Sequence, residues 1–203
     1  MSCKLLLATN NQGKVREYKS LLHSIPLKLV TLEDQGITTE VDEVGESLEE
    51  NASLKAKVLA AESQLLALAD DSGLEVDALG GEPGRLSHRY AGEGASDGDR
   101  IQYLLSRLEG VPWEERSARF RCVIAIAKPS GEVEVCRGEC RGIIAFEPKG
   151  EEGFGYDPIF YLPELGKTMA EIPPEMKNRI SHRGQAARKV YQLLKKKSFL
   201  DFS

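Results

Sequence analysis

Two adjacent acids, Asp70 and Asp71, follow a short apolar run in the stretch ALADDSGLEV. Neighbouring carboxylates repel each other, and beside a buried strand they are costly without a cationic partner. Asp-Asp-Ser-Gly is also good turn chemistry, but a turn explains only one of the two acids. A divalent cation would supply the partner, and Asp71 could also act as a general base toward a water molecule. The pair therefore predicts a metal-assisted or acid–base site.

A second acidic stretch, EVDEVGES, lies upstream and contains Asp42 and Glu43. Mg²⁺ binds carboxylate oxygens and keeps several of its waters, so these acids are candidate metal ligands together with Asp71. The alternative is that they cap the helix expected to follow and complement its dipole. Both interpretations stay open on this stretch alone.

The stretch TNNQGK, Thr9 to Lys14, is a polar loop between an expected strand and an expected helix. Backbone N–H groups at a helix N-terminus favour an anion. A lysine in the first turn is disfavoured by the helix dipole, and a phosphate held between Lys14 and the helix end would explain it. The stretch is not a Walker P-loop, and a polar turn with a surface lysine is the alternative.

Two further stretches, GFGYDP and EMKNRISHRG, add aromatic and basic residues. Glycines around Phe154 and Tyr156 would leave both rings open to a flat ligand. Lys177, His182 and Arg183 gather at a predicted helix start, where anions bind; a basic surface is the alternative. The four stretches together supply loop N–H groups, cations, a carboxylate metal site and an aromatic pair. This combination fits a nucleoside triphosphate with Mg²⁺.

The elements expected to position these groups alternate between strands and helices. Apolar runs predict strands over residues 4–8, 65–69, 74–78, 120–127, 132–136 and 143–146. Helical spacing and a capping-box pattern predict helices over residues 14–25 and 101–108, and from Ser47 and Ser181 onward. Strand–helix units favour parallel pairing, whereas the KPSG turn requires an antiparallel hairpin. The expected fold is α/β, one mixed sheet with helices on its faces.

The composition is typical of a globular protein, with 203 residues of which 41% are hydrophobic and 29% charged. A net charge of −5 argues against a broad nucleic-acid-binding surface. The apolar run near the N-terminus is too short for a signal peptide or a membrane span. Four cysteines without CxxC spacing indicate reduced thiols. We therefore expect a cytoplasmic protein with neither a nucleic-acid nor a membrane partner.

Several longer stretches occur in a distinctive order: GESLEENASLKAK, ADDSGLEVDALGGEPG, GFGYDPIF and EMKNRISHRGQAARK. On these motifs nearly the whole chain resembles the inosine triphosphate pyrophosphatase family, the XTP/dITP diphosphatases. GFGYDP together with ISHRG is the most specific part of the resemblance. The resemblance implies an elongated mixed β-sheet flanked by helices, with two lobes and a central active-site cleft. It also implies one two-lobed domain over residues 1–203 and a homodimer.

The resemblance implies an activity as well: Mg²⁺-dependent hydrolysis of deaminated purine nucleoside triphosphates (ITP, dITP, XTP) to the monophosphate and pyrophosphate. Asp71 would be the catalytic acid, and Asp42, Glu43 and Asp71 would hold the metal. Phe154 would stack on the base. The substrate-binding residues implied are Thr9, Asn10, Asn11, Gln12, Gly13, Lys14, Lys55, Ser72, Phe154, Gly155, Tyr156, Asp157, Lys177, His182 and Arg183.

Two positions depart from the family pattern. Asp42 stands where glutamate is usual, so either Asp42 or Glu43 could reach the metal. His88 stands where a small residue is commoner, and we expect it at the rim of the site. Asp70 is expected to orient Asp71 or to bind metal through water. His182, Arg183 and nearby backbone groups are expected to donate to the 6-oxo group of the base. The alternatives are a non-catalytic nucleotide sensor, or a pyrophosphatase that sanitises other modified nucleotides.

Overall fold

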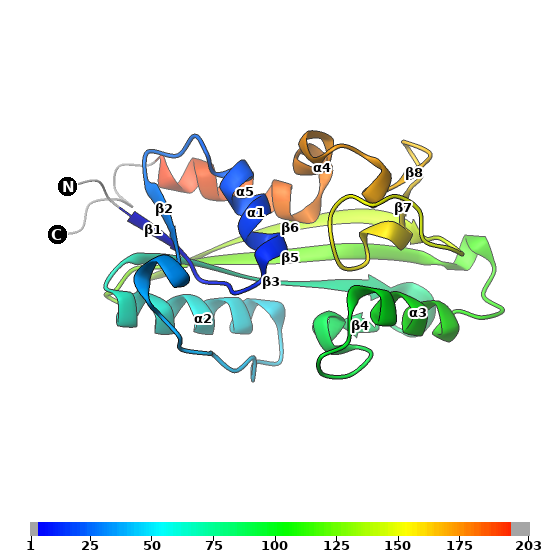
Figure 1. The fold of residues 1–203 in the computed structure, drawn as a ribbon, viewed down its shortest axis with the longest axis horizontal. Coiled ribbons are helices and arrows are strands. Elements are labelled where there is room, and N and C mark those ends of the chain that lie inside the picture. The colour runs from blue at the N-terminus through cyan, green and yellow to red at the C-terminus, as the bar shows by residue number, and fades with distance from the viewer. Residues whose placement is uncertain (1–3, 196–203) are drawn as a thin grey trace. The chain divides into compact units, whose positions relative to one another are not determined.

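The computed structural model describes residues 4–195, and strands and helices alternate along them as the sequence predicts (Figure 1). The strands are β1 (Lys4–Leu7), β2 (Lys28–Thr31), β3 (Leu66–Val76), β4 (Pro83–Gly84), β5 (Ser117–Ala127), β6 (Val133–Ile144), β7 (Phe160–Leu162) and β8 (Lys167–Thr168). The α-helices are α1 (Gln12–Leu21), α2 (Leu48–Ser63), α3 (Asp97–Arg107), α4 (Pro174–Ile180) and α5 (His182–Leu194).

The strands form one 8-stranded mixed sheet in the order β2-β1-β3-β5-β6-β7-β8, and β4 pairs with β3 off this path. β1 is parallel to both β2 and β3. β4 is antiparallel to β3, β7 to β6, and β8 to β7. The predicted α/β class with a mixed sheet is therefore confirmed.

The chain divides into two compact units, each considered by itself below. The first unit comprises Met1–Asp71, Cys122–Gly138 and Arg183–Ser203, and the second comprises Ser72–Arg121 and Glu139–His182. The division falls within strands β3, β5 and β6 and at the start of α5. Consecutive residues of one strand, such as Asp71 and Ser72, thus belong to different units.

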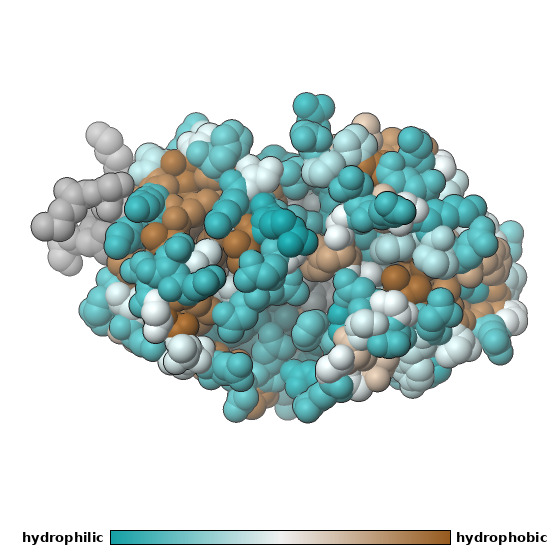
Figure 2. Space-filling model, viewed as in Figure 1, coloured by the Kyte–Doolittle hydropathy of each residue, from teal (hydrophilic) through white to brown (hydrophobic). Residues whose placement is uncertain are grey.

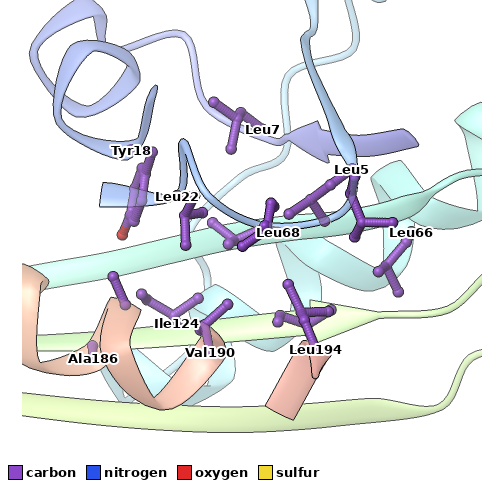
Figure 3. Packing of buried hydrophobic residues seen from close by; sticks show 14 of the residues in the cluster. Leu5, Leu7, Tyr18, Leu22, Leu66, Leu68, Ile124, Ala186, Val190 and Leu194 are labelled. Carbon is purple, nitrogen blue, oxygen red and sulfur yellow. The ribbon is translucent and has the colours of Figure 1, made fainter. Parts of the chain in front are cut away.

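The first unit has an apolar cluster on each face of its strands. Leu5 and Leu7 belong to one cluster and Leu6 to the other, because successive side chains of a strand point to opposite faces. The cluster with Leu5 also contains Tyr18 of α1 and Val190 of α5 (Figure 3). This cluster fixes α1, and with it the TNNQGK stretch, whose last three residues form the first turn of the helix.

The opposite face of the first unit packs against α2. Ala52, Ala56 and Ala60 of α2 are fully buried against strand residues that include Ala67 and Ala69. Small side chains on both surfaces let the helix lie close to the strands. Ser47 caps this helix as predicted, since its hydroxyl accepts the Glu50 N–H at 3.2 Å. The packing and the cap fix the N-terminal turns of α2.

The second unit has its own core, in which α3 packs against strand residues. Leu104 of α3 is fully buried in a cluster with Leu74, Phe120 and Phe160. The rings of Phe120 and Phe160 lie 4.4 Å apart between centroids. Arg116 directly precedes β5. Its side chain donates to the Ile144 carbonyl at 2.8 Å and so connects the chain before β5 to the end of β6.

Two expectations about the elements are wrong in detail, and one helix was not predicted. No turn occurs at the DDSG stretch, because β3 runs unbroken over Leu66–Val76. A side chain at Gly73 would collide with the carbonyl of Gly84 in β4, so this glycine permits close strand pairing rather than a turn. β6 continues to Ile144, so residues 143–146 do not form a separate strand. The last helix, α5, begins at His182, next to the expected start at Ser181, but the separate helix α4 over Pro174–Ile180 was not predicted.

The viewed face of the molecule is mostly hydrophilic, with smaller apolar patches between the polar side chains (Figure 2). Over residues 4–195, the helices are all too short or too polar to cross a bilayer. The cysteines in this range, Cys122, Cys136 and Cys140, are free thiols, as expected; Cys3 lies outside the described residues.

Candidate active site

Asp70 and Asp71 are both buried, with 2% and 4% of their surfaces exposed. As consecutive residues of β3 they point to opposite faces of the strand. Each therefore has its own surroundings in the first unit, and each needs its own compensation for the cost of burying a carboxylate.

Asp70 lies among cations. Its Oδ1 is 3.1 Å from Lys14 Nζ, and its Oδ2 is 3.6 Å from Arg183 Nη2. Burial acts to raise the pKa of Asp70, but the charges of Lys14, Arg183 and Lys55 outweigh it and hold the pKa below its usual value. Asp70 is therefore an ionised group that fixes the positions of two basic side chains.

Asp71 has different neighbours. Its Oδ2 accepts a hydrogen bond from Asn51 Nδ2 at 3.1 Å. Burial raises the pKa of Asp71 and the nearby negative charge of Glu43 adds to the rise, while Lys55 opposes it. A carboxylate with a raised pKa is a stronger base than an ordinary aspartate, and such perturbed acids are typical of functional sites.

Lys55 and Asn51 reach these acids from one face of α2, four residues apart. Lys55 Nζ lies 2.7 Å from Glu43 Oε1 and donates to the Asp70 carbonyl at 2.8 Å. Asn51 Oδ1 accepts the Gly45 N–H at 2.7 Å, so the amide nitrogen is the group that faces Asp71. The i,i+4 spacing of Asn51 and Lys55 can be seen in the sequence, but it indicates no site role for Asn51, whose burial, at 2% exposed, is visible only in the fold.

The TNNQGK stretch joins β1 to α1: Thr9 to Asn11 belong to the loop, and Gln12 to Lys14 form the first turn of the helix. Asn11 is the N-cap, and its side chain accepts the Lys14 N–H at 3.0 Å. Thr9 Oγ1 accepts the Asn11 N–H at 3.2 Å, so these two polar side chains shape the loop. Asn10 and Gln12 are exposed, and Gly13 is buried within the first turn.

Arg183 begins the last segment of the first unit and is 2% exposed. Its Nη1 lies 2.7 Å from Glu17 Oε2, in addition to the contact with Asp70. Burial acts to lower the pKa of Arg183, but the charges of Glu17 and Asp70 outweigh it and raise the pKa. The guanidinium is thus held by two carboxylates of its own unit.

In the second unit, Asp157 organises the GFGYDP stretch. It is 3% exposed, accepts the Phe154 N–H at 2.8 Å and forms an ion pair with the buried Lys177. Lys177 Nζ also lies 5.0 Å from the centroid of the Phe154 ring. Gly153 has a φ of 80°, and a side chain there would collide with Asp157. The loop is therefore compact and internally bonded.

The two aromatic rings of this stretch differ in exposure. Phe154 is half-buried, whereas Tyr156 is 4% exposed within the core of the second unit. The Tyr156 hydroxyl donates to the Ser87 carbonyl at 2.9 Å, and burial raises the pKa of this phenol. The expectation that both rings lie open is therefore wrong for Tyr156, because its ring fills the core.

The remaining predicted residues of the second unit are Ser72, Gly155, His88 and His182. Ser72 is half-buried in β3, and Gly155 follows Phe154 with a φ of 62°. His88 is exposed, and its carbonyl accepts a hydrogen bond from Arg100. His182 is 4% exposed, and its ring stacks on Phe120 with centroids 4.7 Å apart.

A divalent cation would find two suitable carboxylates in the first unit. In the range 4–195, no three His, Cys, Asp or Glu side chains gather as a metal-binding group. Mg²⁺ needs only one or two protein carboxylates when substrate phosphates complete its coordination. Asp71 and Glu43 fit this requirement, since Asp71 is buried beside the like charge of Glu43. Asp42 is exposed, so the donor chemistry favours Glu43 over Asp42.

The fold and these residues define an α/β protein. The polar groups of its first unit gather beyond the carboxyl end of β1 and at Asp70 and Asp71, which follow the part of β3 that pairs in parallel with β1. The chain belongs to the Ham1 family, whose model matches residues 5–193. It is 52% identical over 191 residues to the dITP/XTP pyrophosphatase of Desulforamulus reducens, an alignment that covers 94% of this chain and 95% of that protein.

Other relatives agree. The dITP/XTP pyrophosphatase of Bacillus subtilis is 46% identical over 189 residues, which cover 93% of this chain and 96% of the relative. A solved HAM1 protein from Coxiella burnetii is 42% identical with a TM-score of 0.86, covering 95% of this chain and 98% of that one. The Staphylococcus aureus Ham1 protein is also 42% identical, with a TM-score of 0.85, covering 96% and 99%. The resemblance inferred from the motifs is confirmed.

Proposed function

We propose that this chain is a pyrophosphatase that hydrolyses the deaminated purine nucleotides dITP, XTP and ITP to the monophosphate and pyrophosphate. The observation that carries the proposal is the buried pair Asp70 and Asp71 within β3, with both Lys14 and Lys55 in contact with Asp70. The 52% identity to a dITP/XTP pyrophosphatase over nearly the whole chain supports the substrate class.

The first unit supplies the groups for the phosphates. Lys14 and Lys55 neutralise phosphate charge, and the backbone N–H groups at the start of α1 donate hydrogen bonds to a phosphate oxygen. Asp71 takes the proton of the attacking water, because its carboxylate is buried among the phosphate-binding groups. Asn51 fixes the direction of the Asp71 carboxylate. Asp70 holds Lys14 in place, so the two acids have separate tasks.

The proposed metal requirement rests on two carboxylates of the first unit, those of Asp71 and Glu43. Asp71 and Glu43 would hold Mg²⁺, which when bound neutralises the developing charge on the phosphate oxygens. Lys55 keeps Glu43 in position through their 2.7 Å contact. Asp42 lies outside this set because it is exposed.

The second unit supplies the groups for the base. Phe154 stacks on the purine ring, and Lys177 and Asp157 hold the loop that presents it. His182 donates to the 6-oxo group. Arg183, which was expected to share this task, is held by Glu17 and Asp70. These contacts support a role in positioning Asp70 and the phosphate-binding lysine better than a role in reading the base.

We further propose that residues 1–203 act as a single two-lobed enzyme domain, that the enzyme is a homodimer, and that it acts in the cytoplasm. The family resemblance supports the domain and the dimer. The net charge of −5 supports a small-molecule substrate rather than nucleic acid.

The test is pyrophosphate release from a panel of nucleotides: ITP, dITP, XTP, GTP, ATP, dUTP and CTP, each with Mg²⁺ and with EDTA. We expect rapid release only from the deaminated purines, and only with Mg²⁺. Faster release from dUTP or CTP would favour a pyrophosphatase for other modified nucleotides. Tight binding of ITP without any release would favour a sensor.

A further inference from the structure

Asp97 is the first residue of α3 and stands outside the residues assigned to the site so far. Its Oδ2 accepts the Gly155 N–H at 2.6 Å. Gly155 directly follows Phe154 and has a φ of 62°, a conformation that favours glycine. The carboxylate of Asp97 therefore fastens the backbone next to the aromatic ring proposed to stack on the base.

The other oxygen of Asp97 is also fixed. Asp97 Oδ1 forms an ion pair with Arg100 one turn along the helix, and the Arg100 side chain is only 10% exposed. Arg100 Nη1 donates in turn to the His88 carbonyl at 2.9 Å and to the Ala95 carbonyl at 2.6 Å. Arg100 thus orients the Asp97 carboxylate toward Gly155.

The loop around Phe154 is fastened on both sides of the ring. Asp157 accepts the Phe154 N–H at 2.8 Å, and Asp97 accepts the next N–H along the chain, that of Gly155. Phe154 itself is half-buried, and the two backbone hydrogen bonds fix the chain on which its ring is carried. A stacking ring that is already oriented loses less conformational freedom when the ligand binds.

We propose that Asp97 is a positioning residue that presents Phe154 to the purine ring. The inference rests on the proposed function, because it concerns binding of the base. Stacking on an aromatic ring does not discriminate among bases. Loss of Asp97 should therefore weaken binding of all purine substrates equally, and it should leave the chemistry at the phosphates intact.

Asp99 offers a matched control in the same turn of α3. Its carboxylate accepts the Ser96 N–H at 2.9 Å and the Ser96 hydroxyl at 2.6 Å, which completes the capping box of the helix. Asp99 is exposed. Removing Asp99 costs helix stability, as removing Asp97 also can, but it leaves the hydrogen bond to Gly155 in place.

The test compares Asp97→Ala, Asp97→Asn and Asp99→Ala in the full chain, with kcat and KM for ITP, dITP and XTP, the melting temperature, and binding of a non-hydrolysable ITP analogue. Loss of a charge-assisted hydrogen bond predicts an increase in KM of about tenfold for each substrate in Asp97→Ala, with kcat changed by less than about twofold. Asp97→Asn retains an acceptor for Gly155 and should show a smaller increase. Asp99→Ala should lower the melting temperature and leave KM unchanged.

A double substitution separates positioning from general destabilisation. If Asp97 acts through Phe154, then Asp97→Ala should add nothing to the rise in KM caused by Phe154→Ala, because coupled residues are not additive. Additive effects would overturn the proposal, as would an unchanged KM in folded Asp97→Ala. If Asp97→Ala does not fold, Asp97→Ser is measured by the same criteria. Serine favours a helix start, but its side chain is too short to reach the Gly155 N–H. Absence of pyrophosphate release from the unmodified protein would instead contradict the proposed function itself.

Discussion

Replacing Asn51 by aspartate tests whether this amide orients the catalytic carboxylate. Asn51 Nδ2 donates to Asp71 Oδ2 at 3.1 Å, while Asn51 Oδ1 accepts the Gly45 N–H at 2.7 Å. Aspartate keeps the size of the side chain and the acceptor for Gly45. It replaces the donor to Asp71 by a second carboxylate oxygen, in a place where the side chain is 2% exposed.

The size of the effect follows from these contacts. A hydrogen bond to a charged group contributes about 1.5–3 kcal/mol, which corresponds to a factor of about 10–150. Asn51→Ala loses this bond, so we expect kcat to fall by about tenfold or more. Asn51→Asp loses the bond and adds repulsion between two carboxylates, so its kcat should fall further, by about a hundredfold.

The assay is steady-state release of pyrophosphate from ITP, with the melting temperature as a measure of folding. Lys57→Ala, an exposed position of the same helix, is the control and should leave kcat unchanged. A folded Asn51→Asp protein with the kcat of the unmodified enzyme would refute the reasoning, because Asp71 would then need no donor from α2.

Three further outcomes follow from the structure. Asp71→Asn keeps the size of the side chain but removes its basicity, so turnover of ITP should fall by ~10²–10⁴-fold in a protein that still melts normally; near-normal turnover would remove Asp71 from the mechanism. Lys14→Ala should reduce kcat/KM by at least about tenfold, through loss of a charge-assisted phosphate contact. Lys28 is an exposed position in β2, so Lys28→Ala should have little effect on kcat/KM. Equal effects of the two substitutions would mean that TNNQGK is only a turn. Glu75 contributes a pH-dependent part of the stability: burial acts to raise its pKa, but hydrogen bonds and ion pairs with arginines, Arg119 first, lower the pKa from 4.5. A carboxyl group with a lowered folded-state pKa stabilises the fold above its unfolded pKa, and this contribution is lost as the pH falls through the lowered value. The difference in melting temperature between Glu75→Gln and the unmodified protein should therefore be present at pH 7 and shrink on acidification below about pH 4.5; a difference that does not depend on pH would show that the arginines do not shift this group.

Much of the fold follows from local patterns in the sequence. A short apolar run predicts a strand that is buried on both faces. The side chains of Leu5, Leu6 and Leu7 therefore alternate between two apolar clusters, as this prediction implies. The start of α2 was predictable because Ser47 and Glu50 stand at cap spacing. The loop before α1 was predictable because polar residues end the first apolar run.

Other features depend on contacts between distant parts of the chain. The Ser-Gly of the DDSG stretch resembles a turn, and only the approach of Gly84 shows why Gly73 lies in a continuous strand. Tyr156 directly follows Gly155, and its burial depends on the core of the second unit and on the hydrogen bond to the Ser87 carbonyl, 69 residues earlier.

The pairing of Arg183 depends on Glu17, which lies 166 residues away in the sequence. Asn51 is similar: its spacing from Lys55 was visible, but its contact with Asp71 requires β3 to lie beside α2. These contacts are set by tertiary packing, which the local sequence pattern does not predict.

The identity of the products formed from dITP tests the central claim most directly. With purified protein, Mg²⁺ and dITP, we expect dIMP and pyrophosphate in equal amounts, no orthophosphate, and much slower turnover of ATP under the same conditions. Release of orthophosphate with dIDP, or equal turnover of ATP and dITP, would contradict the account.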